Sequence, residues 1–315
     1  MSTDIDHSSG PPVFVSPPMR MSAGERLGPA LKRMALEQLA VVREGFTLPE
    51  DELLLDGRVH LARKAAKRTR ALLRLVRAEL GTEVFRNENA VIRDQSRRLS
   101  DMRIARVLVT TFDGFTPVDL PDVPMSGFRM IRNILVDHHA SLAAALRADQ
   151  DGLAAAKVAI DCSCRRIGAW IPPETYQQGM AALEPNIRRI YRQGRVAMRA
   201  AESESNAHGF HDWRKRVNYL RYQMEALSGG AQPPIRLLSE SLHALSEILG
   251  DEHDLADLED HLRDRADQVP EEYLEELFAS ANERRRLLQR TALDAGHELY
   301  AAKPGTFMTT LAESW

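Results

Sequence analysis

Basic side chains recur at helical spacing in three stretches of this sequence, and guanidinium and ammonium groups are suited to binding phosphate oxygens. In the first stretch, a helical wheel with about 100° per residue gathers them on one half of a helix. They are His60, Arg63, Lys64, Lys67, Arg68, Arg70, Arg74 and Arg77. The opposite half carries Leu61, Ala65, Leu72, Leu73 and Val76. We therefore expect the apolar half to pack and the basic half to stay accessible.

An internal repeat connects the first stretch with a second one. Four of its basic residues recur 151 positions later, as His211, Arg214, Lys215 and Arg221. About 40 residues after each histidine, the segments Leu99–Arg103 and Leu249–His253 are also similar. The repeat predicts two copies of one helical unit, at residues 23–150 and 151–315, related by pseudo-twofold symmetry. Residues 1–22 are rich in proline and serine and are expected to form a flexible tail.

The third stretch has four arginines with spacings of four, three and four, which places them on one helix face. They are Arg188, Arg192, Arg195 and Arg199. Like charges so placed destabilise an isolated helix by a few tenths of a kcal/mol per pair. Three helices with such faces indicate a polyanionic partner, and packing of the two copies could bring the faces to one groove that concentrates phosphate.

The elements that must position these residues are expected to be helices throughout. Proline and glycine separate helix-length segments whose apolar residues recur every three or four positions. The expected helices are 23–45, 50–80, 84–112, 123–149, 151–170, 174–202, 208–228, 234–268 and 271–302. This pattern is typical of an all-α protein built of packed helical bundles.

Composition narrows the function classes. The 315 residues carry a net charge of −3, which argues against a simple basic nucleic-acid protein. The low aromatic content of 6% argues against base stacking on single strands.

Cys162 and Cys164 lie two apart in an expected helix, where they cannot readily pair. The start of the chain has no secretory pattern, and the sequence has no apolar run of about 18 residues. We expect a cytoplasmic protein.

Five segments in order resemble the CHAD family, which is named for a histidine-containing α-helical domain. They are His60-x-x-Arg63-x-x-x-Lys67-Arg68-x-Arg70-x-x-x-Arg74, Arg188-x-x-Tyr191-Arg192-x-x-Arg195, His211-x-x-Arg214-Lys215 with Leu220-Arg221-Tyr222, Leu249-Gly-Asp-Glu-His-Asp254, and Lys303-Pro304-Gly-Thr-Phe307. The resemblance covers nearly all of the chain after the tail. It departs at Asn218, where the family usually has lysine, and at Ile104, where it usually has aspartate.

The resemblance implies two pseudo-symmetric four-helix bundles with a basic central cleft that binds inorganic polyphosphate. It implies no catalysis, no cofactor and an association with polyphosphate granules. Fifteen basic residues of the family-like stretches are then the binding residues: His60, Arg63, Lys64, Lys67, Arg68, Arg70, Arg74, Arg188, Arg192, Arg195, Arg199, His211, Arg214, Lys215 and Arg221. No catalytic or metal-ligating residue is expected.

Other interpretations of these residues stay open. The basic faces could be solvated and paired with neighbouring helices, and His60 and His211 could be core histidines that bond to the backbone. A polyphosphate or triphosphate hydrolase would need metal-binding carboxylates, and the Glu-x-Glu-x-Lys motif of tunnel triphosphatases is absent. A binder of nucleic-acid backbones is a further alternative. The acidic segment from Glu240 to Glu276 is expected to be a solvated face, and Asp137-His138-His139 a helix surface.

Overall fold

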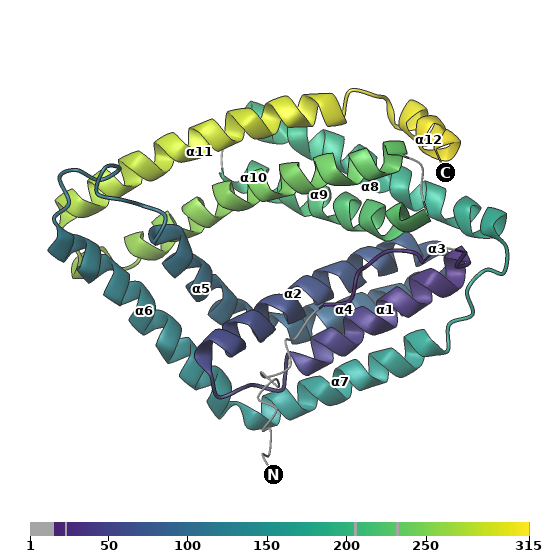
Figure 1. Ribbon diagram of the computed structural model, residues 1–315, viewed down its shortest axis with the longest axis horizontal. Coiled ribbons are helices and arrows are strands. Elements are labelled where there is room, and N and C mark those ends of the chain that lie inside the picture. The colour runs from purple at the N-terminus through teal and green to yellow at the C-terminus, as the bar shows by residue number, and fades with distance from the viewer. Residues whose placement is uncertain (1–15, 23, 205–206, 231–232, 315) are drawn as a thin grey trace, which may run out of the picture.

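A computed structural model describes residues 16–22, 24–204, 207–230 and 233–314, and the regular structure in these ranges is helical (Figure 1). The α-helices are α1 Leu27–Glu44, α2 Glu52–Leu75, α3 Arg77–Leu80, α4 Thr82–Arg97, α5 Ser100–Phe112, α6 Met125–Ala148, α7 Gln150–Gly168, α8 Tyr176–Glu204, α9 Ala207–Leu227, α10 Pro233–Arg263, α11 Glu271–Leu299 and α12 Pro304–Glu313. Short 3₁₀ turns follow α9 at Ser228–Gly230 and α10 at Ala266–Gln268. The prediction of an all-α fold is confirmed.

Local signals explain where α2 begins and ends. The Asp51 side chain caps its N-terminus by accepting a hydrogen bond from the Leu54 backbone N–H at 2.9 Å. The helix stops at Val76, whose φ of −97° and ψ of 18° leave the helical region. The expected helix 50–80 is therefore divided into α2 and α3.

Two further boundaries differ from the expected ones. The expected helix 84–112 consists of α4 and α5, because the chain turns at Arg98 and Leu99, where no proline or glycine signals a break. At the C-terminus, α12 begins with Pro304 in its first turn, a favourable position because proline lacks the N–H that this turn leaves unpaired. Segment 304–313 had not been expected to be helical.

The helices pack in two groups that meet along α2 and α9. In the first group, α1 packs against α2 and α7, and α4 packs against α2 and α7. In the second, α8, α9, α10 and α11 pack in chain order. Helix α2 also packs against α9, and α5 against α10, so each copy of the repeat contacts the other (Figure 1). The second copy was expected to begin at residue 151 and would thus include nearly all of α7. In the structure, α7 packs against helices of the first group.

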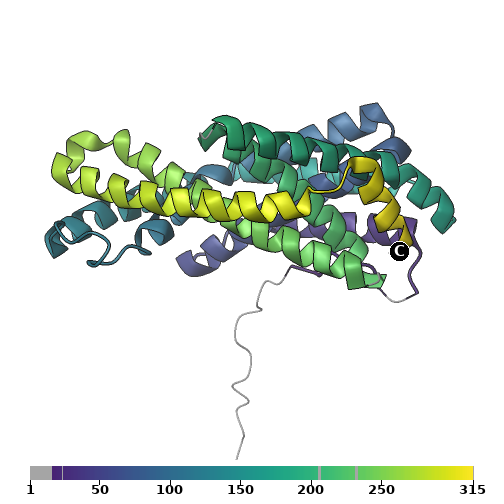
Figure 2. The same cartoon turned by 90° about the horizontal axis from the view of Figure 1, so that it is seen from above.

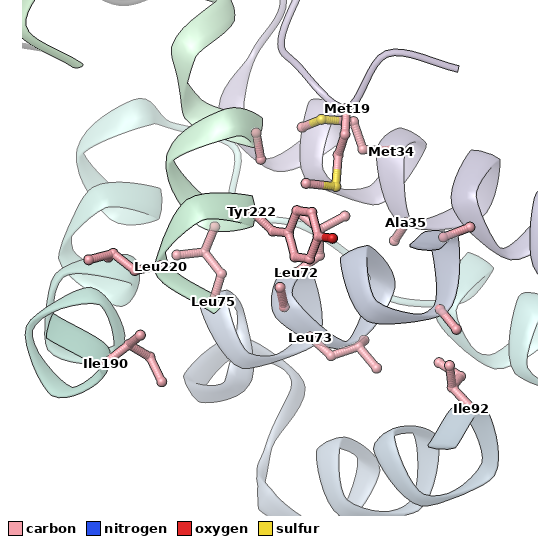
Figure 3. Close-up of a cluster of buried hydrophobic side chains, with 14 of the residues drawn as sticks. Met19, Met34, Ala35, Leu72, Leu73, Leu75, Ile92, Ile190, Leu220 and Tyr222 are labelled. Carbon is pink, nitrogen blue, oxygen red and sulfur yellow. The ribbon is translucent and has the colours of Figure 1, made fainter. Parts of the chain in front are cut away.

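Two apolar cores hold this arrangement together. The larger core contains residues of α1, α2, α4 and α7 to α10, together with α12. Figure 3 shows its middle, where Tyr222 of α9 lies beside Leu72 of α2 and Met34 of α1. The smaller core joins α5 and α6 to the ends of α10 and α11, which lie together at the left of Figure 1. Burial of both cores removes apolar surface from water and fixes the helices that carry the basic residues.

The ends of the described chain are packed against the helices. Met19 is 1% exposed, and the Met21 backbone N–H donates to the Ala226 carbonyl at 3.3 Å. The expectation of a flexible tail over residues 1–22 is thus wrong for residues 16–22, and residues 1–15 lie outside the described residues. At the other end, Figure 2 shows α12 folding back beside α8. Phe307 stacks on Tyr191 there with ring centroids 3.9 Å apart.

Candidate anion-binding site

Basic residues of both copies face each other where α2, α5, α9 and α10 come together. We call this group the central cation cluster, and it consists of His60, Arg63, Lys64, Lys67, Arg103, His211, Arg214 and Lys215. Lys67 lies in its middle, because the charges of Arg63, Arg103 and Arg214 all act on the Lys67 ammonium. These residues are on three different helices, so the cluster depends on the packing of the two copies.

Lys67 combines exposure with a crowded setting. Its side chain is exposed to solvent. Nevertheless, desolvation by the surrounding protein and the three neighbouring arginines lower its pKa to about 8. Asp254, the nearby carboxylate on α10, opposes this shift without cancelling it. An ammonium that water and ligands can reach, surrounded by other cations, is a favourable place for an anion.

Arg63 is fixed in place by the first copy. Its Nη1 donates to the Ser96 carbonyl at 3.0 Å and to the Ser100 hydroxyl. Burial and the charge of Arg103 lower the pKa of Arg63 to about 10. Both acceptors are neutral, so these contacts orient the guanidinium without neutralising it, and the charge of Asp101 opposes its positive charge only through space.

Carboxylates partly neutralise the positive charge that the second copy contributes to the cluster. Arg214 lies 3.7 Å from the Asp254 carboxylate, and Lys215 Nζ donates to Asp212 at 2.9 Å. Burial raises the pKa of Asp254, and burial together with the Asp254 charge raises the pKa of Asp257 to about 6. The cluster is therefore asymmetric, with more uncompensated positive charge on the α2 side than on the α9 side.

Two histidines of the cluster, His60 and His211, and the adjacent His253 are neutral near pH 7. His60 is exposed on α2, and the rings of His211 on α9 and His253 on α10 lie 4.2 Å apart. Desolvation and neighbouring cations lower the pKa of His60 and of His211 to about 4 and that of His253 to about 3. The exposure of His60 argues against a core role for it. His211 is half-buried, and its Nδ1 has no hydrogen-bond partner among the described residues.

Other expected binding residues beside this cluster are engaged with acids. Arg68 is 8% exposed and forms an ion pair with Glu225. Arg221 donates to the Ser246 hydroxyl at 2.5 Å and to Glu247 at 3.0 Å. Because Arg68 is buried and already paired with Glu225, its guanidinium is not available to an external anion.

Arg70 and Arg74 point to the other end of α2. Arg70 Nε and Arg74 Nη1 both donate to Asn89 Oδ1 on α4, at 3.1 and 2.9 Å. The Arg74 guanidinium lies 4.1 Å from the ring centroid of Tyr219 on α9. The basic face predicted for α2 therefore has two parts with different surroundings.

The arginines of α8 have contacts away from the central cation cluster. Arg188 pairs with Glu184 on its own helix at 2.5 Å, and the charge of Arg195 acts on Tyr191, which packs against α12. Arg192 lines a hollow of about 390 Å³ between α8 and α9 that Arg216 also lines. Arg199 is exposed. The structure thus separates Arg188, Arg195 and Arg199 from the cluster that the sequence pattern grouped them with.

Four cations or histidines near these sites were not among the expected binding residues. Arg103 and His253 end the two similar segments of the repeat, so the repeat itself could have indicated them. Arg189 and Arg216 carry no such signal, because their positions in the two copies do not hold matching basic residues. The two departures from the family pattern are Asn218 and Ile104. Asn218 is half-buried and donates to the Arg214 carbonyl, whereas the side chain of Ile104 is exposed.

The acidic segment is solvated in large part, as expected, but two of its carboxylates are buried. Glu252 and Glu259 are 1% and 2% exposed and pair with Arg285 of α11 at 3.1 and 3.5 Å. His139, expected on a helix surface, is 7% exposed and bonds to Asp56 at 2.8 Å. The expectations fail at these three residues, whereas Asp137 and most acids between Glu240 and Glu276 are exposed as expected. The charges that accompany the buried groups lie on other helices, which sequence spacing does not reveal.

Two kinds of feature are absent from the described residues. No group of three or more histidine, cysteine, aspartate or glutamate side chains there has an arrangement that could hold a metal ion. None of the helices in the same ranges is long and apolar enough to span a bilayer.

Comparisons with known proteins agree with the sequence resemblance. The family model described as the CHAD domain matches residues 33–263, and no curated protein matches. A structure described as the crystal structure of the CHAD domain from the plant Ricinus communis is similar, with a TM-score of 0.62 and 17% identity over 93% of this chain and 98% of that one. At that identity the likeness concerns the fold. The family match covers more than two thirds of the sequence, and the chain therefore belongs to the CHAD family.

Proposed function

We propose that this CHAD protein binds inorganic polyphosphate at the central cation cluster and does so without catalysis. The observation that carries the proposal is the position of Lys67, whose exposed ammonium is surrounded by Arg63, Arg103 and Arg214. The positive charges of these side chains repel one another, and the binding of an anion would reduce that repulsion. A chain of phosphates carries repeated negative charge and can contact several of the cations at once.

The donor chemistry supports a phosphate ligand. Arginine presents a planar fork that matches phosphate oxygens, and lysine adds a mobile point charge. Contacts with several phosphates release counterions, so affinity should fall steeply with salt. Longer chains should bind more tightly than short ones, because a second part of the chain binds at high effective concentration. Association with polyphosphate granules would follow from such binding.

The test is a titration of the full chain with long-chain polyphosphate and orthophosphate over a salt series. Arg63 and Arg214 hold contacts to neighbouring helices, so Lys67, an exposed residue, is the better target for charge reversal. Lys67→Glu should weaken long-chain binding at least tenfold, whereas Arg129→Glu, an equal change at an exposed position on α6, should not.

Two results would overturn the proposal. Long polyphosphate that bound no better than orthophosphate at moderate salt would remove the polyanion mechanism. Release of orthophosphate from polyphosphate in the presence of Mg²⁺ or Mn²⁺ would assign a hydrolase instead. Competition by duplex DNA at equal phosphate concentration would favour a general binder of phosphate backbones.

A further inference from the structure

A second group of cations lies where α2, α3, α8 and α9 meet, at the far end of the basic face of α2. We call it the arginine cluster, and it consists of Arg70, Arg74, Arg77, Arg189 and Arg216. All five side chains are half-buried, which leaves part of each one open to solvent. The charges of Arg70, Arg189 and Arg216 act on Arg74, and the charge of Arg77 acts on Arg189. The five guanidinium groups thus form one connected group.

Aromatic rings and one amide hold these arginines in position. The Arg74 guanidinium lies 4.1 Å from the Tyr219 ring centroid, and that of Arg77 lies 5.0 Å from the centroid of Phe85. Cation–π contacts of this kind restrain the guanidinium plane and leave its N–H groups free to donate. Asn89 adds a single acceptor that Arg70 and Arg74 share.

Several donors of the cluster lack a protein acceptor. Within the described residues, no acceptor is found for either Nη atom of Arg70 or for Nη2 of Arg74, and the buried Nε of Arg189 is also unpaired. Buried polar groups are normally hydrogen-bonded, and a guanidinium has no neutral form at ordinary pH. Of these atoms, the Nε of Arg189 is buried without a partner, and the Nη groups of Arg70 and Arg74 are open to solvent, where an external anion can accept hydrogen bonds from them.

Little negative charge offsets the cluster. Asp94, which acts on Arg70, lies 2.7 Å from Arg93 and 3.7 Å from Arg97 and is thus already paired. Burial, as the largest cause, and the neighbouring arginines together lower the pKa of Arg74 to about 10. An anion would remove this repulsion between like charges.

The arginine cluster and the central cation cluster lie on one stripe of α2. Arg63 and Arg74 are eleven residues apart, which is about 16 Å along the helix axis. The neighbours that act on Lys67 are Arg63, Arg103, Arg214 and Asp254, whereas those that act on Arg74 belong to the arginine cluster and Tyr219. The two groups are therefore separate sites on a shared helix face.

We propose that the arginine cluster is a second phosphate-binding site, which holds one part of a polyphosphate chain while another part lies on the central cation cluster. This inference rests on the proposed function, because it takes the same polyanion as ligand. It assigns a binding role to Arg77, Arg189 and Arg216. A chain that reaches both sites gains affinity through effective concentration, and a chain too short to reach both does not.

The experiment compares the double variant Arg189→Ala/Arg216→Ala with the matched control Arg188→Ala/Arg199→Ala. Both remove two arginines, from α8 and α9 in the variant and from α8 alone in the control, and the control positions are exposed and lie outside both clusters. Isothermal titration of each protein with tripolyphosphate and with long-chain polyphosphate gives affinity and stoichiometry, and circular dichroism verifies folding. The variant Arg189→Lys/Arg216→Lys keeps the charge and removes the guanidinium fork, and it serves if the alanine variant does not fold.

For the wild type we expect two tripolyphosphates per chain, and for the double alanine variant one. The variant should bind long chains at least tenfold more weakly than the wild type, the lysine variant should lie between them, and the control should match the wild type within twofold. Equal losses in variant and control would mean that only net charge matters and would overturn the inference, as would unchanged binding in both the alanine and the lysine variant. A wild type that binds no long polyphosphate would instead refute the proposed function.

Discussion

Arg214 on α9 and Asp254 on α10 form an ion pair with a separation of 3.7 Å. In the other copy, Arg63 has the charge of Arg103 nearby and donates only to neutral oxygens of Ser96 and Ser100. Arg214 is thus paired directly with a carboxylate, whereas the charge of Arg63 is opposed through space by Asp101 without a direct ion pair. This asymmetry predicts that the α2 side makes the stronger phosphate contacts.

Removal of the carboxylate at Asp254 should strengthen polyphosphate binding. Asp254→Asn keeps the size of the side chain but frees Arg214 from competition with an internal anion. For a partly exposed pair, we expect affinity to rise about twofold to fivefold. Fluorescence titration at fixed salt measures the change. Asp260→Asn, on the same helix at an exposed position paired with Arg263, is the control. Weaker binding of the Asp254 variant would show that this carboxylate positions Arg214 for the ligand.

The salt dependence of binding should report how many cations touch phosphate. Each contact contributes roughly 0.7 to 0.9 to the slope of log affinity against log salt concentration. Lys67→Ala should therefore reduce the slope by about one contact, and Lys67→Ala/Arg103→Ala by about two. Titrations between low and moderate salt provide the slopes. An unchanged slope in the double variant would place the phosphates away from α2 and α5.

Acid should destabilise the free protein, and polyphosphate should oppose this effect. The pKa values of His60, His211 and His253 are lowered to about 4, 4 and 3, so the unfolded chain takes up these protons near pH 6.5 and the folded chain does not. The stability they contribute is present above pH 6.5 and is lost as pH falls toward 4. A bound polyanion favours the protonated rings.

The measurement for this prediction is the Tm with and without polyphosphate between pH 7.5 and 5.5. The increase in Tm caused by polyphosphate should become larger toward pH 5.5, and the triple variant His60→Asn/His211→Asn/His253→Asn should show a flatter dependence. A ligand effect that is constant over this range in the wild type would mean that the histidines do not contact the bound chain.

The buried ion pairs between α10 and α11 should matter for stability and not for binding. Glu252→Gln removes one of the two buried carboxylates that pair with Arg285, the one at 3.1 Å, and leaves only Glu259 at 3.5 Å. Loss of one member of a buried pair costs about 3 kcal/mol or more. Chemical denaturation should reveal this loss, while Glu240→Gln, an exposed change on α10, should be nearly neutral. Polyphosphate affinity of the folded variant should equal that of the wild type.

The sequence by itself determined the fold class and the residues of the basic faces. Helical periodicity is a local property, so Ala65 and Leu72 were assigned to the packed side of α2, and both are buried. The repeat related His60 to His211 and Arg63 to Arg214, because two copies of one unit preserve spacing along the chain. The division of 84–112 into α4 and α5 was not predictable, since packing and not a helix-breaking residue turns the chain at Leu99.

Only the tertiary structure decided which cations lie together and which are neutralised. Because consecutive residues turn by about 100° around a helix axis, residues three or four apart share a face, but whether that face meets an acid depends on the neighbouring helix. Glu225 neutralises Arg68, Arg285 compensates Glu252, and Arg63 donates only to neutral oxygens. Charge interactions act through space between segments far apart in sequence, so the pattern along one helix could supply the candidates and not the site.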